Sequence, residues 1–178
     1  NDLCGTDHCP GYGSAAKYIA NSIMEINRDA VIYGSPLVIV VEIMGRNAGW
    51  LAAASKLAEV GGYGADLIYL PELPFSYEKF KSDVKKVTDR KKICVVEVSE
   101  GIRFANGKYV GDDGSMTDAF GHSQLGGVCG VLKAKVKELG LKCKAIELNI
   151  LQRCAAHCAS ETDVEESFAA GRHAVKAA

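Results

Sequence analysis

Apolar residues gather into four short runs along the chain. Three of these runs are continuous and rich in β-branched residues, which is typical of buried strands, whereas the fourth alternates and indicates a strand nearer a sheet edge. The three continuous runs cover Leu37 to Ile43, Asp66 to Leu70 and Ile93 to Val98, and the alternating run covers Lys144 to Asn149.

The segments between these runs carry helical signals. Residues 14–29 place Ala15, Ile19, Ile23 and Ile26 on one stripe of helical period. A second helix is predicted over Asn47 to Val60, where Gly61-Gly62 ends it, and a third over Ser76 to Arg90. A fourth is predicted within Asp118 to Leu139, where Gly140 stops it. The last helix is predicted to follow the capping-box-like residues Ser160 or Thr162.

Strands that alternate with helices predict an α/β fold. We expect a layered α/β/α domain with a mainly parallel sheet and right-handed crossovers. The pair Asn106-Gly107 predicts a small hairpin after the third strand. No repeat, low-complexity tract or linker interrupts the pattern, so we predict one domain over residues 1–178.

Composition narrows the class of protein. The chain has 178 residues, 48% hydrophobic and 24% charged, which is the balance of a globular protein. A net charge of −1 argues against general binding to nucleic acid or to a membrane surface, and no apolar run is long enough to span a bilayer. Seven irregularly spaced cysteines favour free thiols in a reducing compartment, so we expect a cytoplasmic protein. Because the first residue is Asn1 rather than Met, we expect a piece of a longer polypeptide.

The first strand leads into a turn with candidate chemistry. Ligands bind at the carboxyl ends of strands in an open parallel sheet. The segment Met44-Gly45-Arg46-Asn47 follows the first strand and opens a helix, where Gly45 allows close approach and Arg46 can hold a phosphate with two hydrogen bonds. An ordinary strand-to-helix turn with a solvated arginine fits the spacing equally well.

Polar residues also follow the other strands. Glu100, in Ser99-Glu100-Gly101, could accept hydrogen bonds from sugar hydroxyls, although Glu before a Gly turn is common. Gln152-Arg153 follow the last strand, whereas Pro71-Glu72 is interpreted as a loop exit. Two arginines, a glutamate and a glutamine could therefore converge on one phosphorylated, hydroxyl-rich ligand, and each charge-assisted bond would contribute about 1.5–3 kcal/mol.

These segments resemble the phosphofructokinase family. Four motifs occur in the family's order over nearly the whole chain. Three of them are the M-G-R motif in Met44-Gly45-Arg46-Asn47-Ala48-Gly49-Trp50, the sugar-binding turn Ser99-Glu100-Gly101 and the Q-R motif Gln152-Arg153. The fourth is the opening of the chain, which is similar to the stretch that follows the family's T-I-D-N-D motif. It comprises Asn1-Asp2, Gly5-Thr6-Asp7-His8 and Gly13 to Lys17.

The resemblance implies the second domain of the phosphofructokinase fold and a phosphotransferase reaction of glycolysis. In that family the 1-hydroxyl of fructose 6-phosphate attacks pyrophosphate or ATP, with Mg²⁺, and the intact enzymes are homodimers or homotetramers. By resemblance, the substrate-binding residues are Met44, Gly45, Arg46, Glu100, Lys144, Gln152 and Arg153. Of these, Arg153 would bind the 6-phosphate, and Lys144 stands where many members have an arginine that the neighbouring subunit uses. Asp2 and Arg46 would lie near the transferred phosphoryl group.

Departures from the family pattern limit what this chain can do alone. The family's catalytic base, glycine-rich donor loop and metal-binding Asp would precede Asn1, so the Mg²⁺ ligand lies outside the chain and the isolated chain is expected to be inactive. Ile150 stands where a His or Tyr is usual, and Leu37 replaces a second borrowed arginine. The segment Glu147 to Arg153 is more similar to pyrophosphate-dependent members.

Two alternatives stay open from the sequence. Cys154, His157 and Cys158, with Cys143 nearby, could form a metal-binding module, although zinc modules usually contain paired C-x-x-C elements. A sugar-phosphate sensor without catalysis would bind fructose 6-phosphate in isolation.

Overall fold

Strands and helices alternate along most of the chain. The computed structural model describes residues 5–6, 8–111 and 127–178. Its elements are α1 (Tyr12–Ala30), β1 (Leu37–Ile43), α2 (Trp50–Ala54), the 3₁₀ helix η1 (Ser55–Gly61), β2 (Leu67–Tyr69), α3 (Tyr77–Lys91), β3 (Ile93–Ser99), α4 (Val128–Lys137), β4 (Lys142–Glu147), α5 (Leu151–Cys154), the 3₁₀ helix η2 (Ala156–Cys158) and α6 (Glu161–Ala177). Within the described residues, no helix combines the length and apolar character needed to cross a bilayer.

The four strands form one parallel sheet in the order β2-β3-β1-β4. Leu37 at the start of β1 lies opposite Ile93 of β3 and opposite Lys142 of β4, so the three strands begin in line. Parallel neighbours require crossover connections, and helices supply them here. The prediction of an α/β fold with a mainly parallel sheet is confirmed.

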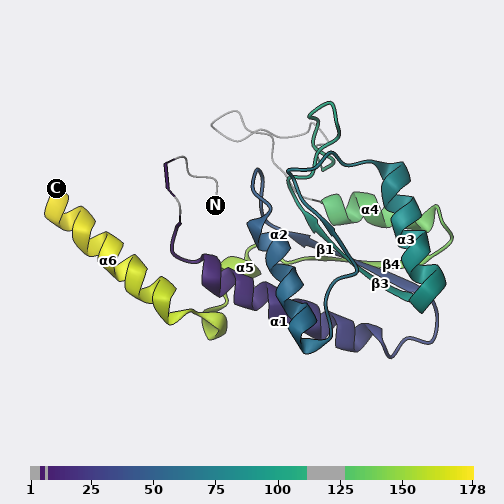
Figure 1. Cartoon of the computed structure of the whole chain (residues 1–178), viewed down its shortest axis with the longest axis horizontal. Helices are drawn as coiled ribbons and strands as arrows, with labels where there is room; N and C mark the ends of the chain where they lie inside the picture. The colour runs from purple at the N-terminus through teal and green to yellow at the C-terminus, as the bar shows by residue number, and fades with distance from the viewer. Residues whose placement is uncertain (1–4, 7, 112–126) are drawn as a thin grey trace.

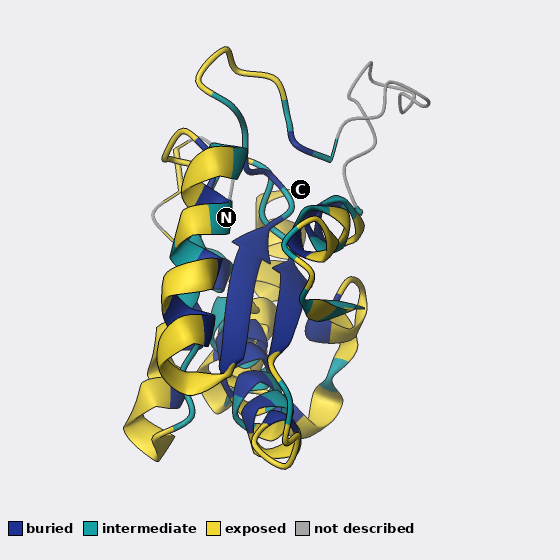
Figure 2. Ribbon diagram, turned by 90° about the vertical axis from the view of Figure 1, so that its right-hand side faces the viewer, coloured by how far each residue is buried: buried dark blue, intermediate teal, exposed yellow. Residues whose placement is uncertain are grey.

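Helices cover both faces of the sheet (Figure 1). Val38 and Val40 of β1 pack in one apolar cluster with residues of α3 and α4. Ile39 and Val41 point to the other face and pack with residues of α1 and η1. Figure 2 shows buried strands between helices whose outer surfaces are exposed. Alternate residues of one strand therefore pack in two hydrophobic cores, one on each face of the sheet, so the domain has three layers.

The outer strands differ from the central ones in burial. All residues of β1 and β3 are buried, as predicted. The three residues of β2 are only half-buried, so the prediction of a fully buried second strand was wrong, because β2 has a neighbour on one side only. The alternation predicted for the last strand is confirmed in β4, where Lys142 and Lys144 are exposed at the sheet edge.

The helix after β1 starts later and is tighter than predicted. It begins at Trp50 instead of Asn47, and at Ser55 it changes to a 3₁₀ helix. The Ser55 hydroxyl donates a hydrogen bond to the carbonyl of Ala52 at 2.6 Å, a local bond of the kind that competes with regular helix geometry. The predicted stop is confirmed, because Gly62 follows with a φ of 80°.

Two other predicted features are found. Gly107 has a φ of 83°, and the Phe104 amide donates to the Lys108 carbonyl at 2.9 Å, which confirms the hairpin. The helix expected within Asp118 to Leu139 is described from Val128, and Asp118 lies outside the described residues.

The last helix is capped differently from the prediction. Ser160 occupies the N-cap position of α6, but its side chain makes no capping hydrogen bond. The buried carboxylate of Asp163 instead accepts hydrogen bonds from the backbone amide of Ser14 at 2.7 Å and from its hydroxyl at 2.6 Å. This contact joins the first turns of α1 and α6, and α6 extends away from the sheet beyond it (Figure 1).

Candidate functional site

Two turns meet where β1 and β3 end. Ile43 and Ser99 are the last paired residues of these strands, so the segments that follow them are neighbours. The Gly45 amide donates a hydrogen bond to Oε1 of Glu100 at 3.1 Å, and the Ser99 hydroxyl donates to the Gly45 carbonyl. The structure therefore brings together two of the predicted site residues, Gly45 and Glu100.

Glycine is required where these turns touch. Gly45 has a φ of 151°, a conformation that favours glycine, and a Cβ there would lie 2.7 Å from the Ala48 carbonyl oxygen. A Cβ on Gly101 would lie 1.9 Å from the Arg46 carbonyl oxygen, far inside van der Waals contact. The backbone of the Arg46 turn thus packs directly on the backbone of the Glu100 turn.

A third segment supports the Arg46 turn from the hairpin. Nη2 of Arg103 donates to Oδ1 of Asn47 at 3.0 Å, and the Tyr109 hydroxyl lies 3.4 Å from the same oxygen. The guanidinium of Arg103 also stacks 4.8 Å from the Tyr109 ring centroid. Arg103 and Tyr109 were not among the predicted site residues, although the hairpin's position just after the Glu100 turn was a usable signal.

Glu72 also contributes to this turn. Its Oε1 accepts a hydrogen bond from the Gly49 amide at 2.7 Å, at the start of α2. Pro71-Glu72 lie in the turn after β2, as the loop-exit interpretation expected, and the Glu72 carboxylate also satisfies an amide at the end of the Arg46 turn. A negative group at this helix start is also electrostatically favourable.

Arg153 and Gln152 line a separate cavity of about 840 Å³ between the segment before α1, α5 and the start of α6. Gln152 is 3% exposed, and both polar atoms of its side chain lack a hydrogen-bond partner among the described residues. Arg153 is exposed. Arg46 and Glu100 are not lining residues of this cavity. The prediction that Arg46, Glu100 and Arg153 face a single cleft stays a prediction.

Lys144 lies apart from these residues within the chain. It pairs with Ile39, four residues before the end of β1, and its ammonium donates to the Tyr33 hydroxyl at 2.6 Å. A carboxylate oxygen of Asp29 lies 3.6 Å from the same ammonium. A role for Lys144 at a neighbouring subunit stays a prediction.

Met44 and Arg46 lie in the turn after β1. Met44 is half-buried between the end of β1 and Gly45, and Arg46 is half-exposed. Asp2 lies outside the described residues.

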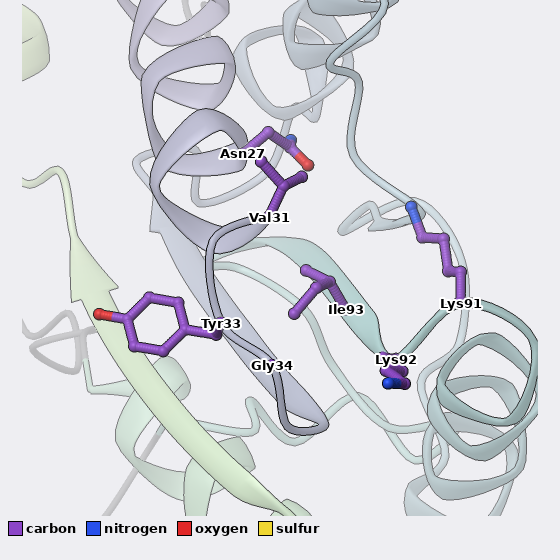
Figure 3. A pocket seen from close by; sticks show the side chains of 7 residues that line it. All are labelled: Asn27, Val31, Tyr33, Gly34, Lys91, Lys92 and Ile93. Atoms are coloured by element: carbon purple, nitrogen blue, oxygen red, sulfur yellow. The ribbon is translucent and has the colours of Figure 1, made fainter.

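A smaller cavity of about 350 Å³ lies at the opposite end of the sheet (Figure 3). It is bounded by the loop after α1 and by the start of β3, and Tyr33 on its wall points toward β4. Lys91, which also lines it, forms an ion pair with Asp66 at 2.5 Å. No predicted site residue lines this cavity.

A buried carboxylate adjoins the site from β1. Oε2 of Glu42 accepts a hydrogen bond from the Cys129 amide at 2.9 Å, which ties the first turn of α4 to the sheet. Burial raises the pKa of Glu42, although this hydrogen bond lowers it in part. Sγ of Cys129 lies 3.5 Å from Oε1 of Glu147. Burial also raises the pKa of the Cys129 thiol, so it is a protonated donor at neutral pH.

Metal-ligating residue types meet at two places among the described residues. One group is Glu42, Cys129 and Glu147, and the other is His8, Asp163 and Glu166. Hydrogen bonds join members of each group to one another or to neighbouring residues: His8 to Glu166, Ser14 to Asp163, the Cys129 amide to Glu42, and the Cys129 thiol to Glu147.

The cysteine and histidine side chains near residue 154 do not converge in the described structure. Sγ of Cys154 lies 3.7 Å from the Leu151 carbonyl, Cys158 is buried near Asn21, and the His157 ring packs edge-on against Tyr18. This arrangement gives no support to the metal-binding module.

Comparisons with known proteins show which family and which relatives this chain is similar to. The family profile described as phosphofructokinase matches residues 1–178. A pyrophosphate–fructose 6-phosphate 1-phosphotransferase of Xanthomonas campestris pv. campestris (strain B100) is 50% identical over 99% of this chain and 43% of its own length. A sulfofructose kinase of Alkalicoccus urumqiensis is 37% identical over 99% of this chain and 45% of its own length.

Solved structures agree with this similarity. The crystal structure of a pyrophosphate-dependent phosphofructokinase from Nitrosospira multiformis matches 99% of this chain and 41% of its own chain, with 40% identity and a TM-score of 0.78. The chain therefore spans less than half the length of these relatives.

Proposed function

This chain belongs to the phosphofructokinase family, and on that premise we propose that it forms the sugar-phosphate-binding part of a pyrophosphate-dependent 6-phosphofructokinase. The complete enzyme would transfer a phosphoryl group from pyrophosphate to the 1-hydroxyl of fructose 6-phosphate. The observation that carries the proposal is the contact between the Gly45 amide and the Glu100 carboxylate, which joins two candidate turns at the carboxyl ends of adjacent strands.

The chemistry of the turns supports the assignment. A phosphoryl group in transfer spreads negative charge over its oxygens, so catalysis depends on positioning and on nearby cations. Arg46 would stabilise that charge, and Met44 and Gly45 would lie along the bound sugar. The carboxylate of Glu100 would accept hydrogen bonds from sugar hydroxyls. Arg153 would hold the 6-phosphate with two hydrogen bonds, and Gln152 beside it would bind through its amide.

The remaining partners belong to the same proposal. The donor site, the catalytic base and the Mg²⁺ ligand would lie in polypeptide beyond this chain, with Asp2 near the chemistry, and ATP is the alternative donor. Mg²⁺ would neutralise phosphate charge when bound. The intact enzyme would be a homodimer or homotetramer, with Lys144 serving a neighbouring subunit.

A cytoplasmic location completes the proposal. The six described cysteines are free, which is compatible with a reducing compartment. Fluorescence microscopy of the tagged protein would test the location.

A chimeric enzyme tests the function. In this chimera the chain replaces the matching 43% of the Xanthomonas campestris relative. We expect the chimera to form fructose 1,6-bisphosphate from fructose 6-phosphate and pyrophosphate, with little activity on ATP, and the 178-residue chain alone to be inactive. A folded chimera without turnover would contradict the proposal. Tight binding of fructose 6-phosphate by the isolated chain, with an inactive chimera, would favour a sensor.

A further inference from the structure

The hairpin after the Glu100 turn presents two side chains to the Arg46 turn. The Val110 amide donates to the Ile102 carbonyl at 3.0 Å, and Arg103 pairs with Tyr109 as an antiparallel bridge. The guanidinium carbon of Arg103 lies 4.8 Å from the Tyr109 ring centroid. Stacking on the ring restricts the guanidinium, so its donors keep a fixed direction.

These donors reach the residues that carry the candidate arginine. Nη2 of Arg103 lies 3.0 Å from Oδ1 of Asn47 and 3.4 Å from the carbonyl oxygen of Arg46. The Tyr109 hydroxyl shares the same Asn47 oxygen at 3.4 Å. The Arg46 turn is therefore held by the hairpin as well as by Ser99 and Glu100.

Arg103 also brings a positive charge to the Arg46 turn. Among the described residues, its guanidinium contacts neutral oxygens and an aromatic ring and forms no ion pair with a carboxylate. The guanidinium lies beside the backbone of Arg46, so its charge raises the positive potential there. That potential favours an anion at the Arg46 turn.

We propose that Arg103 is a positioning residue, which holds the Arg46 turn in the geometry needed to meet the phosphoryl group and adds positive charge beside it. The identity of the anion rests on the proposed function. The positioning itself is a property of this chain and can be measured without substrate.

Hydrogen exchange measured by mass spectrometry on the 178-residue chain tests the positioning. Arg103→Met removes the charge and all donors while keeping most of the side-chain length. Lys108→Met is the matched control, because Lys108 is an exposed cation on the same hairpin. We expect peptides over residues 44–49 to exchange faster in Arg103→Met, by an intermediate amount in Arg103→Lys, and at the parent rate in Lys108→Met.

Unchanged exchange over residues 44–49 in a folded Arg103→Met chain would overturn the proposal. If Arg103→Met does not fold, Tyr109→Phe replaces it, because this variant keeps the ring and removes only the hydroxyl contact with Asn47. Unchanged exchange in Tyr109→Phe and Arg103→Lys together would then overturn the proposal.

Kinetics of the chimeric enzyme test the consequence for the reaction. We expect Arg103→Met to lower kcat roughly ten- to a hundredfold, with a smaller change in KM for fructose 6-phosphate, since misplacement acts mainly on the transfer step. Arg103→Lys should recover part of kcat, and Lys108→Met should match the parent. A parent-like kcat in Arg103→Met would overturn the catalytic consequence. An inactive parent chimera would count against the proposed function, and the exchange result would still decide the positioning.

Discussion

The carboxylate of Glu100 accepts a hydrogen bond from the Gly45 amide at 3.1 Å, across 55 residues of sequence. The bond forms because β1 and β3 are parallel neighbours that end at the same level, Ile43 opposite Ser99. A side chain expected to bind sugar hydroxyls therefore also supports the turn expected to bind the phosphoryl group. Changes on either turn should affect both roles.

Gly101→Ala should disturb this contact. Its Cβ would lie 1.9 Å from the Arg46 carbonyl oxygen, so the two turns must separate. We expect a loss of about 1–3 kcal/mol in the free energy of unfolding, measured with urea. Gly130→Ala is the control, since nothing lies within 4 Å of its Cβ and alanine suits a helix, so it should be neutral or stabilising. Equal stability of the two variants would contradict the packing described for Gly101.

Arg153→Ala should weaken substrate binding in the chimeric enzyme. Arg153 is exposed at a cavity and is proposed to hold the 6-phosphate, so its removal should raise KM for fructose 6-phosphate roughly tenfold or more. Initial-rate assays with pyrophosphate in excess measure this change. Arg172→Ala, an exposed arginine on α6, should leave KM unchanged. A parent-like KM in Arg153→Ala would remove the phosphate-binding role.

Glu97→Gln should change how stability depends on pH. Glu97 is fully buried in β3, and burial raises its pKa to about 8, although the nearby Ser55 hydroxyl lowers it in part. Between its ordinary pKa of 4.5 and about 8, the unfolded chain loses this proton while the folded chain keeps it. Stability should therefore fall as pH rises through this range, by up to about 1.4 kcal/mol per pH unit.

The glutamine variant should lose that dependence. We expect Glu97→Gln to gain stability relative to the parent as pH rises from 5 to 8, measured by urea unfolding at each pH. Glu165→Gln, at an exposed position of α6, should show a constant difference from the parent. A constant difference for Glu97→Gln as well would show that Glu97 is ionised in the folded chain.

Asp163→Asn should loosen the attachment of α6. Burial raises the pKa of Asp163, but hydrogen bonds from Ser14 and from the Gly11 backbone outweigh it, so the pKa is lowered overall. The carboxylate thus contributes stability above its ordinary pKa of 3.8, and that contribution is lost as pH falls through the lowered value. At pH 7 we expect a loss of about 1.5–3 kcal/mol.

Thermal unfolding and limited trypsin digestion measure this effect. Cleavage at Arg172 and Lys176 of α6 should accelerate in Asp163→Asn at pH 7. Glu161→Gln, an exposed acid in the same first turn, should digest like the parent. Identical digestion of both variants would show that the contact with Ser14 does not anchor α6.

The sheet and its layers were predictable because each strand carries its own pattern. Uninterrupted β-branched runs indicate burial on two faces, and β1 and β3 have it. The meeting of Gly45 with Glu100 was also within reach, since residues after adjacent parallel strands lie together. The burial of β2 was not predictable, because strand order decides which strand has only one neighbour.

The missed contacts all join segments that are distant in the sequence. Glu72 bonds Gly49 and Asp163 bonds Ser14, and no local pattern indicates either pair. Ser160 shows a local signal that the structure does not follow. Its spacing to Asp163 fits a capping box, but the Asp163 carboxylate accepts hydrogen bonds from Ser14 of α1 instead. Long-range geometry thus overrides a valid local signal.

The open edge at β4 has a consequence for how copies of this chain behave together. An outer strand exposes a row of backbone groups that a strand from another molecule could extend, which is the route to fibrils. Lys142 places an exposed ammonium group on this edge strand, whereas the Lys144 ammonium lies 3.6 Å from Asp29, so a stacked copy would set mainly the Lys142 charges side by side. At neutral pH and low salt, Coulomb repulsion should therefore discourage ladder growth from β4.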